Sequence, residues 1–232
     1  MKILAIETAT EACSVALLCN DQVDARFEHK PQKQARLVLP MVDELMAAAG
    51  LRPSQLDAVA FGAGPGSFTG LRIAAAVTQA IAITADLPVI PVSTLAVLAQ
   101  GTFREYGSTA VLASIDARMR EVYWGVYTLD NDNLMQLQGL EQVLPPEEVP
   151  VPDSGHWVGA GSGWRAHDAL LRRRVEHLQD VKSDCWPQAQ DVLTLALPLY
   201  RQGKTIPAGQ AEPVYLRNKV ALSIAERRAG RQ

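Results

Sequence analysis

The chain alternates short apolar runs, bounded by turn residues, with longer segments whose apolar positions recur at helical spacing. The short runs predict strands at residues 3–6, 14–18, 23–27, 58–61 and 89–92. The periodic segments predict helices over residues 35–49, 71–85 and from an N-cap at Ser93 to about residue 100. A strand, a helix and another strand in this order indicate a parallel βαβ unit, so the expected fold class is α/β.

The pattern of the first residues restarts near residue 103. Residues 111–115 form an apolar run that ends at Asp116 and is followed by a polar turn and a return strand at 122–127. The N-terminal run ends in the same way at Glu7, before its own return strand. This similarity favours a duplicated domain, although hairpins are common enough for one such pair to arise by chance. The predicted division is two related domains and a tail, at 1–102, 103–217 and 218–232.

The rest of the second half carries weaker signals. Residues 130–155 are rich in acid, proline and glutamine and predict loop or weak structure. A second glycine cluster at 159–164 precedes a predicted helix that reaches about His177, and a further helix is expected near 188–202. Residues 214–217 predict a short strand or turn, and the arginine-containing tail is expected to be frayed.

Composition indicates a folded chain with a sizeable core. The chain has 232 residues, of which 48% are apolar and 20% charged, and a formal net charge of −3. No uninterrupted apolar run reaches about 18 residues, so no membrane span is predicted, and the start meets Glu7 before a signal-peptide core can form. Three cysteines without CxxC spacing favour a reduced, cytoplasmic chain: Cys13, Cys19 and Cys185.

Two other classes of function receive little support from the sequence. The basic run at 172–174 is followed by Glu176 and Asp180 and lacks an aromatic stripe, so it predicts a solvated helix face rather than autonomous nucleic-acid binding. The four histidines have no HxxxH or HxH spacing, and no metal site is predicted from them. The chain also lacks the GxSxG elbow of serine hydrolases.

The most unusual segment is the glycine-rich stretch 62–70, which follows a predicted strand and opens a predicted helix. In that position its backbone amides would face an anion at the helix N-terminus. The stretch lacks the Gly-Lys-Ser/Thr ending of a P-loop and does not fit GxGxxG, so kinase-loop and dinucleotide interpretations fit poorly. The alternative is a tight turn in which glycines supply positive φ angles and Thr69 caps the helix.

Glu7 and Asp116 end the two repeated strands and are the candidate acids. Carboxylates placed there would face each other across a cleft and hold a magnesium–nucleotide complex, with Thr8 and Thr10 near the phosphates. The alternative is a pair of solvated acids at strand ends. The candidate nucleotide or phosphate site comprises Glu7, Thr8, Thr10, Gly64, Gly66, Ser67 and Asp116.

The two predicted helices of the first half carry more apolar surface than one packed face needs. The 35–49 helix is apolar on more than one face, and the 71–85 helix is rich in alanine, which permits close approach of a second helix. Helices of this kind are either fully buried or hold a partner. Packing on the chain's own sheet is one interpretation. The other is a partner interface formed by Leu37, Val38, Met41, Val42, Leu45, Ala74, Val77, Thr78 and Ile81.

Four blocks of sequence, in order along nearly the whole chain, resemble the TsaB (YeaZ) family. They lie at residues 6–16, 64–73, 115–124 and 212–217. The Gly-Pro-Gly-Ser-Phe-Thr-Gly and Asp-Ala-Arg-Met stretches within them are long and specific. The resemblance implies a fold of the actin, hexokinase and heat-shock ATPase (ASKHA) type, with two related domains around a cleft, which agrees with the repeat.

The resemblance also implies a role in making threonylcarbamoyladenosine at position 37 of tRNAs that read codons starting with A. In that pathway TsaD transfers the threonylcarbamoyl group to N6 of the adenosine. TsaB-like chains are its non-catalytic partner, and the small ATPase TsaE joins the complex. This chain would then reach tRNA only through the complex, bind TsaD through its first two helices, and form a homodimer through the same face when unpaired.

Departures from related sequences bear on catalysis and on nucleotide binding. TsaD-like proteins carry a metal-binding HxxxH, and the matching positions here are Thr94 and Leu98, which cannot replace imidazole ligands. Relatives usually have Asp at the position of Glu7 and commonly Arg at the position of Ala63. The segment 34–37 also departs from the histidine-containing segment of relatives. The expected chain is therefore not an enzyme and has no cofactor of its own.

Two questions stay open at this point. ATP or ADP could bind at the cleft or at a subunit interface. The alternative function is an independent ATPase or small-molecule kinase of the ASKHA superfamily that uses Glu7 and Asp116 across the cleft. Dinucleotide-dependent redox chemistry is a distant third, because neither glycine cluster has the fingerprint.

Overall fold

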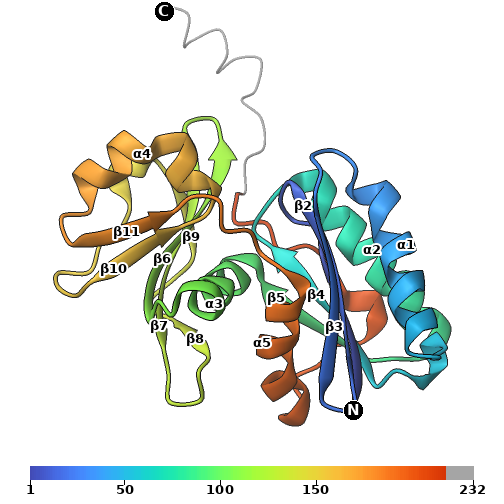
Figure 1. The fold of residues 1–232 in the computed structure, drawn as a ribbon. Coiled ribbons are helices and arrows are strands. Elements are labelled where there is room, and N and C mark those ends of the chain that lie inside the picture. Colours follow the sequence, from blue (N-terminus) through green and yellow to red (C-terminus); the bar gives the residue numbers. More distant parts are fainter. Residues whose placement is uncertain (218–232) are drawn as a thin grey trace, which may run out of the picture.

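Residues 1–217 are described by the computed structural model, and they form two β-sheets with helices around and between them (Figure 1). The first sheet has the order β3-β2-β1-β4-β5. Its first three strands are antiparallel, and β4 and β5 run parallel to β1. The strands are β1 (Lys2–Glu7), β2 (Ala12–Cys19), β3 (Gln22–His29), β4 (Ala58–Gly64) and β5 (Val89–Ser93).

The second sheet repeats this arrangement. Its order is β11-β10-β6-β7-β8, with β9 paired to β7. Read from β8, it again has three antiparallel strands followed by two strands parallel to the central one. The two sheets therefore share one strand order. The strands are β6 (Ala110–Arg118), β7 (Glu121–Leu129), β8 (Met135–Leu137), β9 (Gln142–Leu144), β10 (Trp157–Ala160) and β11 (Leu178–Lys182).

Five α-helices are described within residues 1–217, and they separate into three layers (Figure 1). Two of them, α1 and α2, cover one face of the first sheet, whereas α3 and α5 lie between the sheets and α4 covers the far face of the second. The helices are α1 (Gln34–Ala48), α2 (Phe68–Ala85), α3 (Thr94–Tyr106), α4 (Ser162–Arg174) and α5 (Ala189–Arg201). Short 3₁₀ turns lie at Pro53–Gln55, Pro146–Glu148 and Ala208–Gln210.

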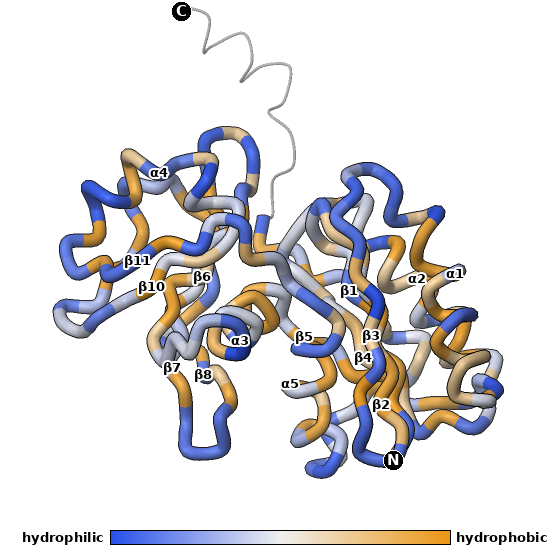
Figure 2. Tube along the Cα trace, in the orientation of Figure 1, coloured by the Kyte–Doolittle hydropathy of each residue, from blue (hydrophilic) through white to orange (hydrophobic). Residues whose placement is uncertain are grey.

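The strand β1 is buried on both faces because helices cover both sides of the first sheet. Leu4 and Ile6 pack toward α1 and α2, and Ile3 and Ala5 pack toward α5. A strand covered on both faces reads as a continuous apolar run, which is why its sequence predicted it well. Figure 2 shows the same contrast, with hydrophobic strands such as β2 and β4 and a hydrophilic loop between β7 and β8.

The helix α5 falls in the second half of the sequence but packs on the first sheet. Val192, Leu193 and Ala196 lie in the same cluster as Ile3 and Ala5. The predicted boundary between residues 102 and 103 therefore does not divide the packing, since a helix beyond it completes the first core. The tail at 218–232 lies outside the described residues.

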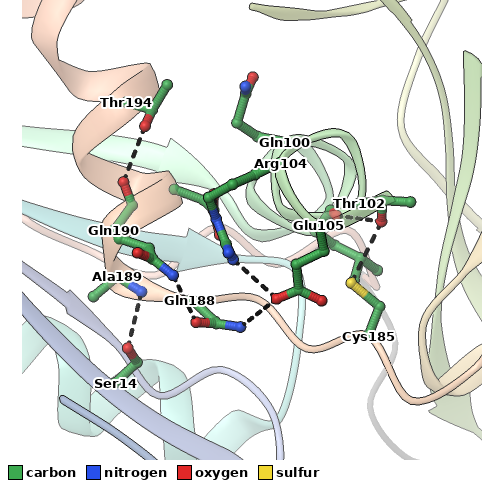
Figure 3. A network of polar contacts seen from close by, with 12 residues as sticks. Ser14, Gln100, Thr102, Arg104, Glu105, Cys185, Gln188, Ala189, Gln190 and Thr194 are labelled. Atoms are coloured by element: carbon green, nitrogen blue, oxygen red, sulfur yellow. Dashed lines mark hydrogen bonds and ion pairs between the residues drawn. The ribbon is translucent and has the colours of Figure 1, made fainter. Parts of the chain in front are cut away.

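A buried ion pair joins α5 to α3. Arg104 donates from Nε to Asp191 Oδ1 at 2.8 Å and from Nη2 to Oδ2 at 3.0 Å, and the Asp191 side chain is fully buried. Around this pair, Arg104 also contacts Glu105, which accepts a hydrogen bond from Gln188, and Ala189 N donates to Ser14 Oγ (Figure 3). These contacts tie α3, α5 and β2 together between the sheets.

Most predicted helices lie where they were expected, and their ends show the main differences. The helix predicted at 35–49 is α1, and Ser93 caps α3 by accepting a hydrogen bond from Ala96 N, as predicted. Thr69 does not cap α2, because Ser67 accepts the hydrogen bond from Gly70 N instead. The helix α3 also continues past the predicted end near residue 100, to Tyr106.

The helix α2 bears on the question of a membrane span. Its 18 residues have a mean hydropathy of 1.4, so by length and composition it could cross a membrane, although no span was predicted from the sequence. Such a helix is weak evidence for a span, because core helices of folded proteins pass the same test. Here a third of it is buried, where Ala74, Ala75 and Ala82 pack against the first sheet.

Candidate functional site

A cavity of about 860 Å³ lies between the two sheets, at the ends of β1 and β6. Residues of both halves line it: the β1–β2 turn, the segment before α1, the loop before α2, the β6–β7 turn and the start of α4. Tyr215 and Arg217, near the end of the described chain, close one side. The predicted cleft between the repeated units is therefore present.

The glycine loop is held tightly against the β1–β2 turn. Ser67 N donates to Ala9 O at 2.7 Å, and a side chain on Gly66 or Gly70 would collide with this turn, because a Cβ on Gly70 would lie 2.0 Å from Thr8 O. The glycines thus permit a close backbone approach. Ser67, Phe68 and Thr69 remain exposed and line the cavity at the N-terminus of α2.

Only part of the predicted phosphate site faces the cavity. Thr10, Gly66, Ser67 and Asp116 line it, but Glu7, Thr8 and Gly64 do not. Thr8 is buried and donates from Oγ1 to Gly70 O at 2.7 Å, so it fixes the loop from behind. Gly64 lies against Val214 O, where a Cβ would come within 2.5 Å. The sequence indicated which segments meet at the cleft, but it could not show which of their residues face the cavity.

Glu7 is withdrawn from the cleft into the protein. Its Oε1 accepts a hydrogen bond from Ala9 N at 2.6 Å, and its buried Oε2 has no partner. The carboxyl group fits only because Gly62 lacks a side chain, since a Cβ there would lie 1.8 Å from Oε2. Burial raises the pKa of Glu7 to about 7, and the hydrogen bond from Ala9 offsets part of this effect.

Asp116 lies at the cavity wall but already has a cationic partner. Its Oδ2 accepts from Arg118 Nη1 at 2.9 Å, and its Oδ1 accepts from Arg118 N at 2.9 Å. His167 Nε2 lies 3.8 Å from the same carboxylate, and Asp116 N donates to Ser162 Oγ. The prediction that the two carboxylates face each other across the cleft is therefore wrong, because Glu7 is buried and Asp116 pairs with a guanidinium.

The side chains that face the cleft do not fit a magnesium–nucleotide complex. Mg²⁺ needs several oxygen ligands that share one site, but Glu7 does not reach the cavity and Asp116 is paired with Arg118. Within residues 1–217, no group of three or more His, Cys, Asp or Glu side chains is arranged to hold a metal ion. A phosphate group without a metal fits better, since the Ser67 hydroxyl, the N–H groups of the first turn of α2 and the Arg118 guanidinium are potential donors around the cavity.

The predicted partner interface needs the largest correction. Six of its nine residues are buried in the chain's own core, because α1 and α2 use one face each to cover the first sheet: Val38, Met41, Val42, Leu45, Ala74 and Thr78. Only Leu37, Val77 and Ile81 are partly exposed. The outward faces of these helices instead carry Leu39 and Ile83, which are 51% and 63% exposed.

The sequence reasoning missed three residues of the site: Arg118, Tyr215 and Arg217. Each belongs to a block that carried the family resemblance, but no spacing rule connects residues a hundred positions apart. Thr94 and Leu98 lie on α3 and are fully buried, so neither position reaches the cleft.

Two sheets of one strand order around a shared cleft are typical of the ASKHA class of fold. Residues 29–223 match the family described as "TsaD: tRNA N6-adenosine threonylcarbamoyltransferase". The chain is 46% identical to the Escherichia coli "tRNA threonylcarbamoyladenosine biosynthesis protein TsaB", over 95% of this chain and 96% of that one. The Bacillus subtilis protein of the same name is 32% identical over 66% of this chain and 64% of its own length.

A solved structure gives the same result. "YeaZ from Pseudomonas aeruginosa" superposes with a TM-score of 0.87 at 46% identity, covering 93% of this chain and 99% of that one. The chain therefore belongs to the TsaB (YeaZ) family.

Proposed function

We propose that this chain acts in the biosynthesis of threonylcarbamoyladenosine in tRNA, as an accessory subunit that binds the catalytic protein TsaD, with TsaE joining the complex. The observation that carries the proposal is the 46% identity, over 95% of the chain, to a protein named for this biosynthesis. Such a subunit acts in the cytoplasm and contacts tRNA through the complex.

A non-catalytic role is supported by the groups that the chain lacks at the positions where chemistry would occur. Thr94 and Leu98 occupy the places of the metal-binding histidines of TsaD-like proteins, and neither side chain can replace an imidazole ligand. Glu7 is buried away from the cleft, and Asp116 at the cleft wall is paired with Arg118. These positions therefore offer neither a histidine pair for a metal nor an unpaired acid as a base, which favours an accessory role.

The outward faces of α1 and α2 support the position proposed for the partner. Leu39 and Ile83 are exposed there, and Leu37, Val77 and Ile81 are partly exposed. Small residues at Ala76 and Ala80 are also exposed and allow a partner helix to approach closely. Exposed apolar area of this kind marks a protein interface. In the absence of TsaD, the same face would pair two copies of this chain.

The cleft is the proposed place for ATP or ADP, held without a metal ion at the first turn of α2. When the chain is in the complex, the nucleotide could also contact the partner subunit. Ser67 and Thr69 would bind phosphate oxygens together with the backbone N–H groups of that turn.

The proposed function is tested by threonylcarbamoyl transfer to tRNA in a purified system. Three mixtures are compared: the complete one, one without this chain, and one in which this chain replaces TsaD. We expect transfer only in the complete mixture. Full activity without the chain would contradict the proposal, and activity when it replaces TsaD would show that it is a catalyst. An independent ATPase would instead hydrolyse ATP alone and lose this activity in Asp116→Ala.

The partner face is tested by single exposed substitutions. Ile83→Glu places a charge on the outward face of α2 and should weaken binding to TsaD by at least about tenfold, because an unpaired charge is buried at the interface. Leu140→Glu is the matched control, since Leu140 is 75% exposed on the second sheet's side. Equal binding of both variants in a pull-down or by calorimetry would place the partner elsewhere.

A further inference from the structure

The last described residues cross from one sheet to the other beside the cleft. We name residues 212–217 the strap; its end, drawn in red, lies between the two sheets in Figure 1. At the first sheet, Val214 N donates to Ala63 O at 2.7 Å. Arg72 Nε donates to Tyr215 Oη at 3.3 Å, and the Tyr215 ring lies 5.6 Å from that of Phe68. The strap is thus anchored to β4 and α2.

At its other end the strap is anchored to the second sheet by Arg217. The Arg217 guanidinium donates to the carboxylate of Glu121 and to Arg118 O at 3.5 Å, and its Nη1 lies 3.3 Å from Met119 Sδ. The Arg217 side chain is only 15% exposed. One side chain therefore contacts three residues at the β6–β7 turn: Arg118, Met119 and Glu121.

That turn has an unusual backbone. Arg118, Met119 and Arg120 have φ angles of 60°, 55° and 62°, although none is a glycine. Left-handed φ angles strain residues that carry a Cβ, and runs of them are rare. Such a segment persists only where its surroundings hold it in place. Arg217 supplies that support, because it binds the turn through both a backbone carbonyl and a side chain.

The strained turn places Arg118 across the mouth of the cleft. Its Nη1 donates to Asp116 Oδ2 at 2.9 Å on the second sheet, and its Nη2 lies 3.6 Å from Glu11 Oε1 on the β1–β2 turn of the first. The guanidinium therefore bridges carboxylates of the two halves. A single cation in this position attracts both sides of the cleft toward each other.

We propose that the strap and the turn form a clasp that sets how far the cleft opens. Arg217 is a positioning residue that keeps the turn left-handed, and Arg118 then links Glu11 to Asp116. The Arg104–Asp191 pair between α3 and α5 is not part of the clasp, so it still joins these helices when the clasp is lost. Loss of the clasp opens the cleft without separating the halves. The clasp acts within this chain, and its argument does not depend on the proposed role with TsaD.

The clasp is tested by measuring the distance between the two halves by pulsed electron–electron double resonance. Spin labels are placed on Ser54→Cys and Ala169→Cys, which are exposed on opposite halves, in a Cys19→Ser background. Cys13 and Cys185 are buried. Unlabelled chain is added in excess, so that distances within one molecule are measured. We expect one narrow distribution in the parent protein, and a longer and broader one in Arg217→Met and in Arg118→Met.

Arg26→Met is the matched control, because Arg26 pairs with Glu44 at 2.7 Å within the first half alone. Its distance distribution should equal that of the parent. If Arg217→Met fails to fold, Glu121→Gln weakens the same contact from the other side. Amide exchange at residues 119–121 should also rise by about tenfold in folded Arg217 or Glu121 variants. Unchanged distances in the folded clasp variants, or an equal change in Arg26→Met, would overturn the proposal.

Discussion

Two carboxylates hold the same place in the two repeated sheets, yet their surroundings are opposite. Glu7 ends β1 and is fully buried, with one oxygen unpartnered and a pKa raised to about 7 by burial. Asp116 lies near the end of β6, lines the cavity and accepts two hydrogen bonds from Arg118. The turns that follow also differ, since only the turn after Asp116 contains left-handed non-glycine residues.

This comparison shows that the two sheets share a strand order but differ in the chemistry at the ends of their central strands. In a symmetric cleft, both acids would face the same ligand and share a cation between them. Here Glu7 is buried away from the cleft, and Arg118 of the same chain pairs with Asp116. The repeat therefore predicts where the cleft lies but not what it binds. Each prediction below tests one side of this difference.

The largest expected effect is the pH dependence of stability that comes from Glu7. Its pKa rises from 4.5 in the unfolded chain to about 7 in the folded one, so the folded state binds the proton more tightly. Glu7 therefore contributes about 3 kcal/mol to the free energy of unfolding below about pH 4.5, and this contribution is lost as the pH rises through 7. Glu7→Gln cannot ionise, so the variant should become more stable than the parent protein above pH 7.

Urea unfolding of the parent and of Glu7→Gln between pH 5 and pH 9 measures this effect. The difference between the two proteins isolates Glu7 from the other ionisable groups. Cys13 lies near Glu7, but burial raises its pKa to about 12, so it stays protonated over this range. Parallel pH profiles of the two proteins would mean that Glu7 is already ionised in the folded state. The comparison with Asp116 would then fail.

The next effect concerns the space that Glu7 occupies. Gly62→Ala places a methyl group 1.8 Å from Glu7 Oε2, so either the carboxyl group or β4 must move. Overpacking of this kind costs about 1–3 kcal/mol. In a Glu7→Ala background the same substitution should cost less than about 1 kcal/mol, because the clashing atoms are absent. Thermal unfolding of the four proteins gives the coupling, and an additive result would show that Gly62 is not what admits Glu7.

The sequence predicted much of the fold because the central strands are apolar on both faces. β1, β2 and β4 were found within a few residues of their ends, and Ser93 was identified as the cap of α3. The repeated strand–acid–turn pattern also favoured a duplicated domain, and the family resemblance implied two related domains around a cleft. These features depend on residues that are near each other along the chain.

The rest depends on contacts between distant residues. Nothing near Glu7 in the sequence shows that Gly62 leaves room behind it. Helical spacing predicted that Met41 and Leu45 are apolar positions of one helix, but not that the chain's own sheet buries them. The return of α5 to the first sheet was missed for the same reason, as were the contacts of Arg217 with a turn about a hundred residues earlier.

A smaller effect is expected from the strained turn on the Asp116 side. Met119 has a φ angle of 55°, which glycine adopts without strain. Met119→Gly and Met119→Ala both remove the contact with Arg217, but only the glycine relieves the backbone. The glycine variant should therefore be more stable than the alanine variant by about 1 kcal/mol. Chemical denaturation measures the difference, and an alanine variant of equal or greater stability would show that the turn is unstrained.

The smallest effect is expected at Asp116 itself, where the contrast with Glu7 is greatest. Asp116→Asn keeps an acceptor for Arg118 N and removes the charge that attracts the guanidinium. Because the Arg118 side chain is 76% exposed, solvent screens this pair, and the loss should be below about 1 kcal/mol and shrink as salt is added. Asp168→Asn breaks a similar exposed pair with Arg172 inside α4 and serves as the control. A larger, salt-independent loss at Asp116 would mean that this acid is as deeply coupled to the fold as Glu7, and the two halves of the cleft would then differ in geometry alone.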